Sequence, residues 1–279
     1  MGAYPVFFST HGSRSRSSKG PVLFSGPADA RHKRDHLRRL FTGQNSASSK
    51  AVGKALLAPS VGTVYERIMN ILVVGASQGT GALSVKTALD RGHRVTAFAR
   101  SPEKLTLSHA NLTRVAGSFH DRGAVEAVVP GHDAVLITAS TSGISGFRKN
   151  PNYFSQGTAL VVDAMKAASV ERLVVLSALG VGESRAQNGF LLNTLVVDFV
   201  LRGPFQDHER QEKLVKASGL AWVIARPARL HDGPARHAYA KETGTKKVPG
   251  SIARADVADF LVEAAEVDTW VRKAVQLGG

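Results

Sequence analysis

The chain has 279 residues, 43% of them hydrophobic, and a formal net charge of +14, so it can form one large domain or two small ones with a sizeable core. It has no cysteine, which excludes disulfides, thiolate catalysis and cysteine-ligated zinc and is compatible with the reducing cytoplasm, where we place the protein. No stretch is long and apolar enough to span a bilayer, so we expect no membrane partner.

The first 65 residues differ in composition from the rest of the chain. They are rich in Ser, Gly and Arg, and residues 1–69 carry a net charge of +8 against +6 for residues 70–279. A targeting peptide, a basic arm for nucleic acid, and an extension without structure upstream of an initiator at Met69 all fit this composition. We favour the last, which predicts an unstructured basic extension over residues 1–68 and no nucleic-acid partner.

A strand, a glycine-rich loop and a helix follow one another at the start of the remaining chain. The stretch 70–74 is short, apolar and β-branched, as a buried parallel strand is, and a helical pattern reaches Arg91. The loop between them contains Gly75, Gly79 and Gly81. Glycines allow a tight turn and a close backbone approach, and the N–H groups at a helix N-terminus bind phosphate. A plain turn can have such a loop, but the strand before it and the helix after it predict a dinucleotide pyrophosphate site.

Strands and helices alternate along the rest of the chain. The hydrophobic patterns predict strands at 94–99, 112–116, 134–138, 172–177, 220–225 and 271–277, and helices near 121–129, 153–168, 207–218 and 254–265. This alternation predicts an α/β fold with a doubly wound parallel sheet, the Rossmann architecture. We expect it to occupy residues 69–279 as a single domain, with small C-terminal elements on the substrate side.

One apolar segment, residues 189–205, interrupts the alternation before the helix at 207–218. It is interpreted either as an apolar cover over a planar substrate or as a helix that packs on the body or on a second subunit, and the second interpretation is favoured. The chain is accordingly expected to be a monomer or a homodimer.

The end of the second strand predicts which dinucleotide is bound. An acidic residue there binds the ribose 2′-hydroxyl of NAD, whereas a cation accommodates the 2′-phosphate of NADP. The residue at this position is Arg100, and Ser101 beside it is a second phosphate donor. No acidic residue lies between Arg91 and Pro102. A surface arginine at a strand end is common, but the register of Arg100 with the glycine loop favours NADP.

At this point the sequence resembles a known family. It is similar to the atypical short-chain dehydrogenase/reductases of the NAD(P)H-binding, NmrA-like type, and within them to the flavin reductase/biliverdin-IXβ reductase branch. The matching motifs lie at 75–81, 95–100, 132–135, 155–166, 170–177, 207–212 and 218–227. The family usually has G-A-T-G-x-x-G in the loop, where this chain has Ser77 and Gln78 in place of Thr and Gly and a further glycine at Gly79.

The resemblance implies a set of site residues along the carboxyl ends of the strands. It implies that Ser118 lies near adenine, where relatives often have Asp, and that the nicotinamide lies near Ser177 and the segment around Pro227. The ribose and nicotinamide ribose would lie along Thr138 to Ser140. The cofactor-binding residues expected in all are Gly75, Ser77, Gln78, Gly79, Thr80, Gly81, Arg100, Ser101, Ser118, Thr138, Ala139, Ser140 and Pro227.

The chemistry is expected to need little more than hydride transfer. The Tyr-x-x-x-Lys pair of the wider superfamily, in which Lys lowers the pKa of the Tyr acid, is absent from this sequence. We therefore expect an NADPH-dependent reductase of a small planar acceptor, such as a flavin, a quinone or a tetrapyrrole, that takes its proton from water. The candidate catalytic residue is Ser177, which would polarise the substrate or hold the carboxamide; capping the next turn is an equal alternative. The rival function is a non-catalytic NADP(H)-binding sensor of the NmrA-like type.

Several other polar residues are interpreted as structural. Asp207, His208 and Glu212 fit an acid/base pair or a metal site less well than they fit the start of a helix. Arg226 is expected to pair with a carboxylate or with backbone beneath the pocket. We therefore predict no metal site.

Overall fold

The structure, a computed structural model, describes residues 67–141, 147–187 and 202–279. The predictions for the extension over residues 1–68 and for the apolar segment at 189–205 fall almost wholly outside these residues. Only the last four residues of the apolar segment are described, and they belong to a helix.

An eight-stranded sheet forms the centre of the described chain, in the order β3-β2-β1-β4-β5-β6-β10-β8. Every neighbouring pair is parallel except β10 and the antiparallel edge strand β8. The strands are β1 (Asn70–Val74), β2 (Arg94–Ala99), β3 (Leu112–Ala116), β4 (Ala134–Ile137), β5 (Arg172–Leu176), β6 (Ala221–Pro227), β8 (Ala240–Glu242) and β10 (Lys273–Gly278). This order confirms the predicted doubly wound parallel sheet.

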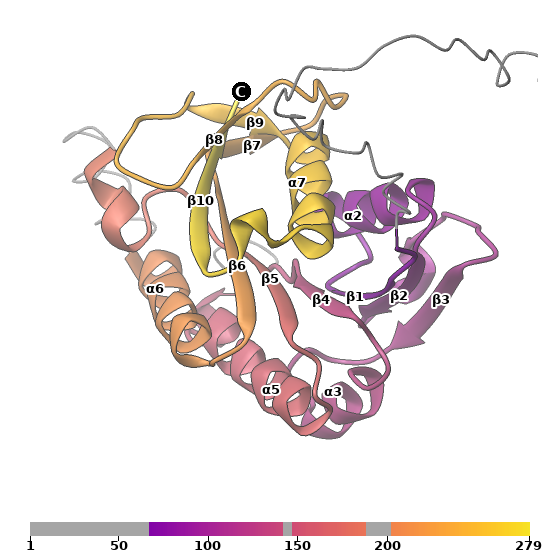
Figure 1. The fold of residues 1–279 in the computed structure, drawn as a ribbon. Helices are drawn as coiled ribbons and strands as arrows, with labels where there is room; N and C mark the ends of the chain where they lie inside the picture. Colours follow the sequence, from indigo (N-terminus) through magenta and orange to yellow (C-terminus); the bar gives the residue numbers. More distant parts are fainter. Residues whose placement is uncertain (1–66, 142–146, 188–201) are drawn as a thin grey trace, which may run out of the picture. The chain divides into compact units, whose positions relative to one another are not determined.

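Helices cover both faces of the sheet (Figure 1). Helices α2 (Gly79–Asp90) and α7 (Arg254–Glu266) pack on one face. Helices α3 (Arg122–Val128), α5 (Tyr153–Ala167) and α6 (Arg202–Ala217) pack on the other. The chain also forms 3₁₀ turns at η1 (Pro102–Lys104), η2 (Gly182–Gln187) and η4 (Asp268–Trp270).

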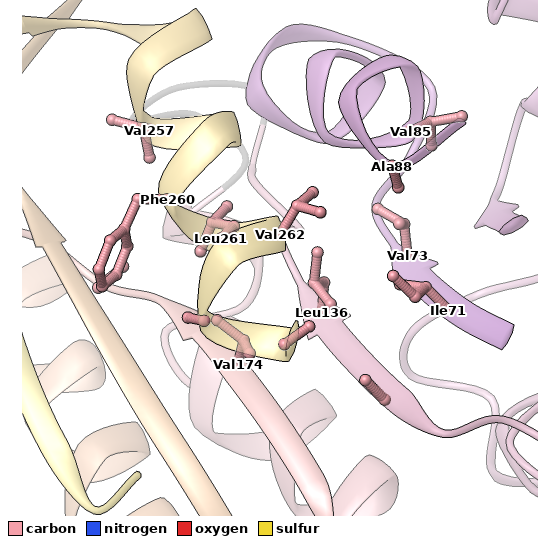
Figure 2. Close-up of a cluster of buried hydrophobic side chains, with 14 of the residues drawn as sticks. Ile71, Val73, Val85, Ala88, Leu136, Val174, Val257, Phe260, Leu261 and Val262 are labelled. Atoms are coloured by element: carbon pink, nitrogen blue, oxygen red, sulfur yellow. The ribbon is translucent and has the colours of Figure 1, made fainter. Parts of the chain in front are cut away.

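The central strands are apolar on both faces, as a sheet covered by helices on both sides requires. Because successive side chains of a strand point to opposite faces, Ile71 and Val73 of β1 join the cluster under α2 and α7. Leu72 and Val74 join the cluster under α3, α5 and α6. Figure 2 shows the first cluster, in which α7 contributes Val257, Phe260, Leu261 and Val262.

The predicted helix at 207–218 begins earlier than expected, at Arg202. Gly203 and Pro204 resemble a helix breaker in the sequence, but proline is tolerated in the first turn, where its missing N–H has no intrahelical partner. Gly203 has a packing role, since a Cβ there would lie 2.6 Å from a ring carbon of Phe147. The predicted start at Asp207 is therefore wrong.

Three short strands were absent from the prediction. β7 (Arg229–His231) pairs with β9 (Ser251–Ala253) in a separate two-stranded sheet, and β8 adds to the main sheet beside β10. Each has three residues, too few for an alternating pattern to be recognised in the sequence.

Candidate functional site

The glycine loop packs tightly against the carboxyl end of β4. Gly75 has a φ of +88°, and a Cβ there would lie 2.5 Å from Cα and 2.6 Å from N of Ala139. A Cβ at Gly81 would lie 2.2 Å from the carbonyl oxygen of Gly75. No side chain fits at either position, so both glycines are required by this close approach. Gly79, the first residue of α2, has a φ of +56° and open space around it.

The N-terminus of α2 is open to an anion. Its N-cap residue, Gln78, makes no side-chain capping hydrogen bond, and the first turn contains no acidic residue. The first N–H groups of a helix have no intrahelical partner, and the helix dipole favours negative charge beside them. The arrangement fits the pyrophosphate of a dinucleotide.

A pocket of about 520 Å³ extends from this loop along the carboxyl ends of β1, β2, β3 and β4. Most of its lining is polar and comes from four separate loops. It contains eight of the predicted site residues, namely Gly75, Ser77, Gln78, Arg100, Ser101, Ser118, Ala139 and Ser140. The sheet therefore brings together residues that are up to 65 positions apart in the sequence, at the edge where such sheets bind nucleotides.

The pocket is basic at the end of β2. Arg100 and Lys104 both line it, and none of its described lining residues is Asp or Glu. Among the residues that the structure describes, no carboxylate forms an ion pair with either cation. Two unpaired cations beside a serine hydroxyl fit a phosphate group.

An aromatic wall closes the pocket on the side of β3 and α5. The ring centroids of His120 and Tyr153 lie 4.5 Å apart, and those of Tyr153 and Phe119 lie 5.9 Å apart. The Nε2 of His120 lies 2.9 Å from the carbonyl oxygen of Tyr153, which fixes the imidazole. Burial raises the pKa of Tyr153, and the nearby Arg100 opposes this only in part. The sequence analysis did not identify these residues or Lys104, since only the fold brings them to the glycine loop.

The other predicted site residues lie outside this pocket lining. Gly79, Thr80 and Gly81 lie within the first turn of α2. The hydroxyl of Thr138 donates to the carbonyl of Val74 over 2.9 Å, which ties β4 to the loop. Pro227 ends β6, and its carbonyl accepts from the N–H of Leu179 over 2.9 Å.

Ser177, the predicted catalytic residue, belongs to a buried charged network. It follows β5, and its hydroxyl lies 2.7 Å from Oε1 of Glu212 on α6. Nε of Arg226 donates to the same oxygen over 2.9 Å, and Nη2 of Arg226 donates to Oε2 over 2.5 Å. Ser177, Glu212 and Arg226 are 6%, 2% and 1% exposed. The structure confirms that Arg226 pairs with a carboxylate.

Electrostatics keep this network charged. Burial disfavours the charged guanidinium, but Glu212 and Glu183 outweigh it and raise the pKa of Arg226. The hydrogen bond from Arg226, over 3.1 Å, lowers the pKa of Glu183 to about 2.

Asp207 and His208 act between helices. Asp207 is fully buried in the second turn of α6, and its Oδ2 accepts from the backbone N–H groups of Phe154 and Ser155 at 2.7 and 3.4 Å. It thus caps α5, whose own N-cap residue makes no side-chain capping bond. The His208 ring stacks on Phe154 at 3.9 Å, and burial lowers the pKa of His208. Asp207 was expected to belong to a helix start. It does cap the start of α5, but it lies inside its own helix, α6.

Replacing Asp207 by alanine is expected to lower the free energy of unfolding by about 2 kcal/mol, because buried N–H groups of α5 lose their acceptor. Asp121 is a matched control, since it is exposed and caps its own helix α3 through the N–H of Ala124 at 3.2 Å. Asp121→Ala is expected to cost about 1 kcal/mol. Urea unfolding measures both, and equal losses would contradict the role of Asp207.

No helix among the described residues is both long and apolar enough to cross a membrane. The described ranges also contain no group of three or more His, Asp or Glu residues that could hold a metal ion.

Comparison with known proteins indicates NAD(P)H binding, which agrees with the position and the lining of the pocket. The model of the NAD(P)H-binding family matches residues 75–268. A chloroplastic protein of Arabidopsis thaliana is 31% identical over 204 residues, which cover 70% of this chain and 71% of the relative.

Two solved structures share the fold at low sequence identity. A short-chain dehydrogenase/reductase from Veillonella parvula, solved in complex with NADP, is 18% identical with a TM-score of 0.64 and covers 76% of this chain and 95% of its own. ChuY from Escherichia coli O157:H7, described as an anaerobilin reductase, is 22% identical with a TM-score of 0.61 and covers 75% of this chain and 96% of its own.

These matches confirm the family resemblance that the motifs indicated. The family match covers the glycine loop, all the pocket-lining elements after it and the buried network of Ser177, Glu212 and Arg226. The chain belongs to the NAD(P)H-binding family.

Proposed function

We propose that the protein is an NADPH-dependent reductase that passes a hydride to a small planar acceptor, such as a flavin, a quinone or a linear tetrapyrrole. The observation that carries the proposal is the basic pocket at the end of β2, with Arg100 and Lys104 unpaired among the described residues and no acidic lining residue. Such a pocket favours the 2′-phosphate of NADP over the free ribose hydroxyls of NAD.

The remaining lining residues fit the rest of the cofactor. The loop from Gly75 to Gln78 and the N-terminus of α2 would hold the pyrophosphate, and Ser118 and His120 border the adenosine end. Ala139 and Ser140 lie in the direction of β5, towards the nicotinamide. Bound NADPH would supply the hydride, and the protein would position it against the acceptor.

The choice of a planar acceptor follows from the proton donors at the site. The Tyr153 phenol has a raised pKa, which makes it a weaker acid, and Gly157 occupies the position where the superfamily has Lys. Tyr239 is hydrogen-bonded to Asp259 on α7 over 3.1 Å. The Ser177 hydroxyl is engaged with Glu212. An acceptor that takes its proton from water suits this arrangement, and the fold likeness to an anaerobilin reductase supports a tetrapyrrole-like one.

The same scarcity of acids favours a second candidate, a non-catalytic NADP(H) sensor. One experiment separates the two functions. The full-length protein is titrated with NADPH and NADH by fluorescence, and NADPH oxidation is then followed with FMN, a quinone and biliverdin. We expect NADPH to bind at least about tenfold more tightly than NADH and to be oxidised by at least one acceptor. Tight binding without oxidation would establish the sensor, and failure to bind would contradict both candidates.

Arg100→Glu is expected to raise the dissociation constant of NADPH by about tenfold or more and to leave that of NADH nearly unchanged, because only NADPH carries the 2′-phosphate. Arg94→Glu is a matched control. Arg94 is also exposed, but it begins the strand whose far end leads into Arg100, so the same charge change occurs away from the pocket. Titration of both variants measures the effect. If Arg94→Glu weakens NADPH as much as Arg100→Glu does, the preference comes from general charge and not from this site.

A further inference from the structure

The direction of one buried hydrogen bond sets what Ser177 can do. Both oxygens of Glu212 accept from Arg226, at 2.9 and 2.5 Å. A carboxylate in this arrangement is ionised and has no proton to give. In the 2.7 Å bond between Ser177 and Glu212, the serine is therefore the donor.

This bond leaves Ser177 as a pure acceptor. A serine hydroxyl has one proton and two lone pairs, and the proton of Ser177 points to Glu212. Ser177 consequently cannot donate to a substrate carbonyl or protonate a product while the bond lasts. What its oxygen can still do is accept an N–H.

The surrounding residues keep this direction fixed. Lys216 adds a second cation 3.7 Å from Glu212. Nη2 of Arg226 also donates to Glu183 over 3.1 Å. The backbone at Gly182, with a φ of +55°, lies so close to Arg226 that a Cβ there would be 3.2 Å from Nη2. Arg226 is thus held on both sides, and its two N–H groups remain directed at the two oxygens of Glu212.

The topology brings Ser177 beside the cofactor pocket. In the parallel register of β4 and β5, Ile137 is opposite Val175, and Ala139 and Ser177 each follow two residues later at the carboxyl ends of these neighbouring strands. Ala139 lines the pocket. Ser177 therefore lies one strand beyond the pocket lining, which is about 4.8 Å, on the side that leads away from Arg100.

We propose that Glu212 and Arg226 are positioning residues that hold Ser177 as the hydrogen-bond acceptor for the NH₂ group of the nicotinamide carboxamide. This inference rests on the proposed binding of NADPH, and it assigns Ser177 to the cofactor rather than to polarisation of the substrate. Accepting this N–H fixes the rotation of the carboxamide and so selects which face of the nicotinamide is presented to the acceptor.

The test uses the acetylpyridine analogue of NADPH, which keeps the carbonyl but has a methyl group in place of the NH₂. For the full-length wild type we expect the analogue to bind about tenfold more weakly than NADPH, because the lone pair of Ser177 is left without a donor. In Ser177→Ala the two ligands should bind equally. In Ser177→Thr, which keeps the hydroxyl, the preference should return.

A second pair of variants tests the positioning residue and its control. In Glu212→Gln, one of the two oxygens that accept from Arg226 is replaced by an NH₂ donor, so a carboxylate no longer fixes the direction of the Ser177 bond; the preference for NADPH over the analogue should fall. Ser218→Ala is the control. Ser218 is a buried serine at the end of α6 whose hydroxyl donates to the carbonyl of Val215 over 2.7 Å, and its removal should leave the preference unchanged.

The outcomes separate the two proposals. Equal weakening of both ligands in Ser177→Ala, with an unchanged preference, would overturn the role of Ser177. A wild type that binds both ligands equally would overturn it as well, while NADPH binding itself would stand. A wild type that binds neither ligand would overturn the proposed function and this inference together.

Discussion

Replacing Gly75 by alanine is expected to lower the free energy of unfolding by about 3 kcal/mol or more and to abolish measurable NADPH binding. Two effects add. The φ of +88° costs an L-residue about 1–2 kcal/mol, and the new Cβ would lie 2.5 Å from Cα and 2.6 Å from N of Ala139. Because these are backbone atoms, the overlap can be relieved only by moving the loop away from β4, which deforms the pocket between them.

Gly92→Ala provides the matched control. Gly92 follows α2 with a nearly identical φ of +83°, but no atom lies within 4 Å of the position its Cβ would take. It should therefore show only the conformational cost, about 1–2 kcal/mol, and bind NADPH as the wild type does. Urea unfolding and NADPH titration of the two variants measure both effects. Similar losses of stability in the two would mean that φ alone, and not the approach to Ala139, makes glycine necessary at 75.

The sequence was sufficient for the sheet because its central strands carry their own signal. The runs at 70–74 and 172–176 are apolar and β-branched, and helical patterns lie between the predicted strands, so strand, helix and parallel topology follow from local sequence. The glycine loop and Arg100 were found in the same way, since their spacing reflects the length of one strand–helix–strand unit.

The pocket wall could not be predicted, because it depends on contacts between distant segments. His120 follows β3 and Tyr153 begins α5. Their rings lie 4.5 Å apart only because the fold places the start of α5 beside the end of β3. Lys104 is close to Arg100 in sequence, but whether a lysine of a short 3₁₀ turn faces the pocket or the solvent depends on the geometry of the turn and not on composition.

Helix α6 shows a different limit of sequence analysis. Three of its four buried residues, Asp207, Gln211 and Glu212, are polar and only Val215 is apolar, so the usual apolar stripe toward the core is weak. The structure satisfies each of them through another segment. Asp207 caps α5, Gln211 donates to Thr158 over 2.8 Å, and Glu212 binds Arg226 and Ser177. The sequence analysis assigned Asp207 and Glu212 to a helix start, and the network that they form is visible only in the fold.

Breaking the ion pair between Arg226 and Glu212 by changing one partner is expected to cost about 3–5 kcal/mol, because the other charge is left buried without a partner. Arg226→Met leaves Glu212 with Ser177 and the more distant Lys216, and Glu212→Leu leaves Arg226 with Glu183 alone. The double variant should cost far less than the sum of the two, since apolar side chains of similar volume can replace a buried pair with little loss. Urea unfolding of the four proteins gives the coupling free energy.

The exposed pair between Lys86 and Asp90 on α2 is the control for this cycle. Its charged atoms lie 2.5 Å apart, as close as those of Arg226 and Glu212, but both side chains are more than half exposed. Its coupling should be about 0.3–0.5 kcal/mol. A coupling of that size for Arg226 and Glu212 would mean that burial does not raise the cost of separating the charges there.

The double variant also separates stability from ligand binding, because the fold is retained while Ser177 loses the carboxylate that takes its proton. If the ion pair only stabilises the protein, a folded Arg226→Met, Glu212→Leu variant should still prefer NADPH to its acetylpyridine analogue. If the pair holds Ser177 as an acceptor, the preference should disappear although the free energy of unfolding is largely restored. In that case hydrophobic residues could replace the buried ion pair at little cost to stability, but the preference for NADPH would be lost. The function of the pair would then be to set the direction of the Ser177 hydrogen bond.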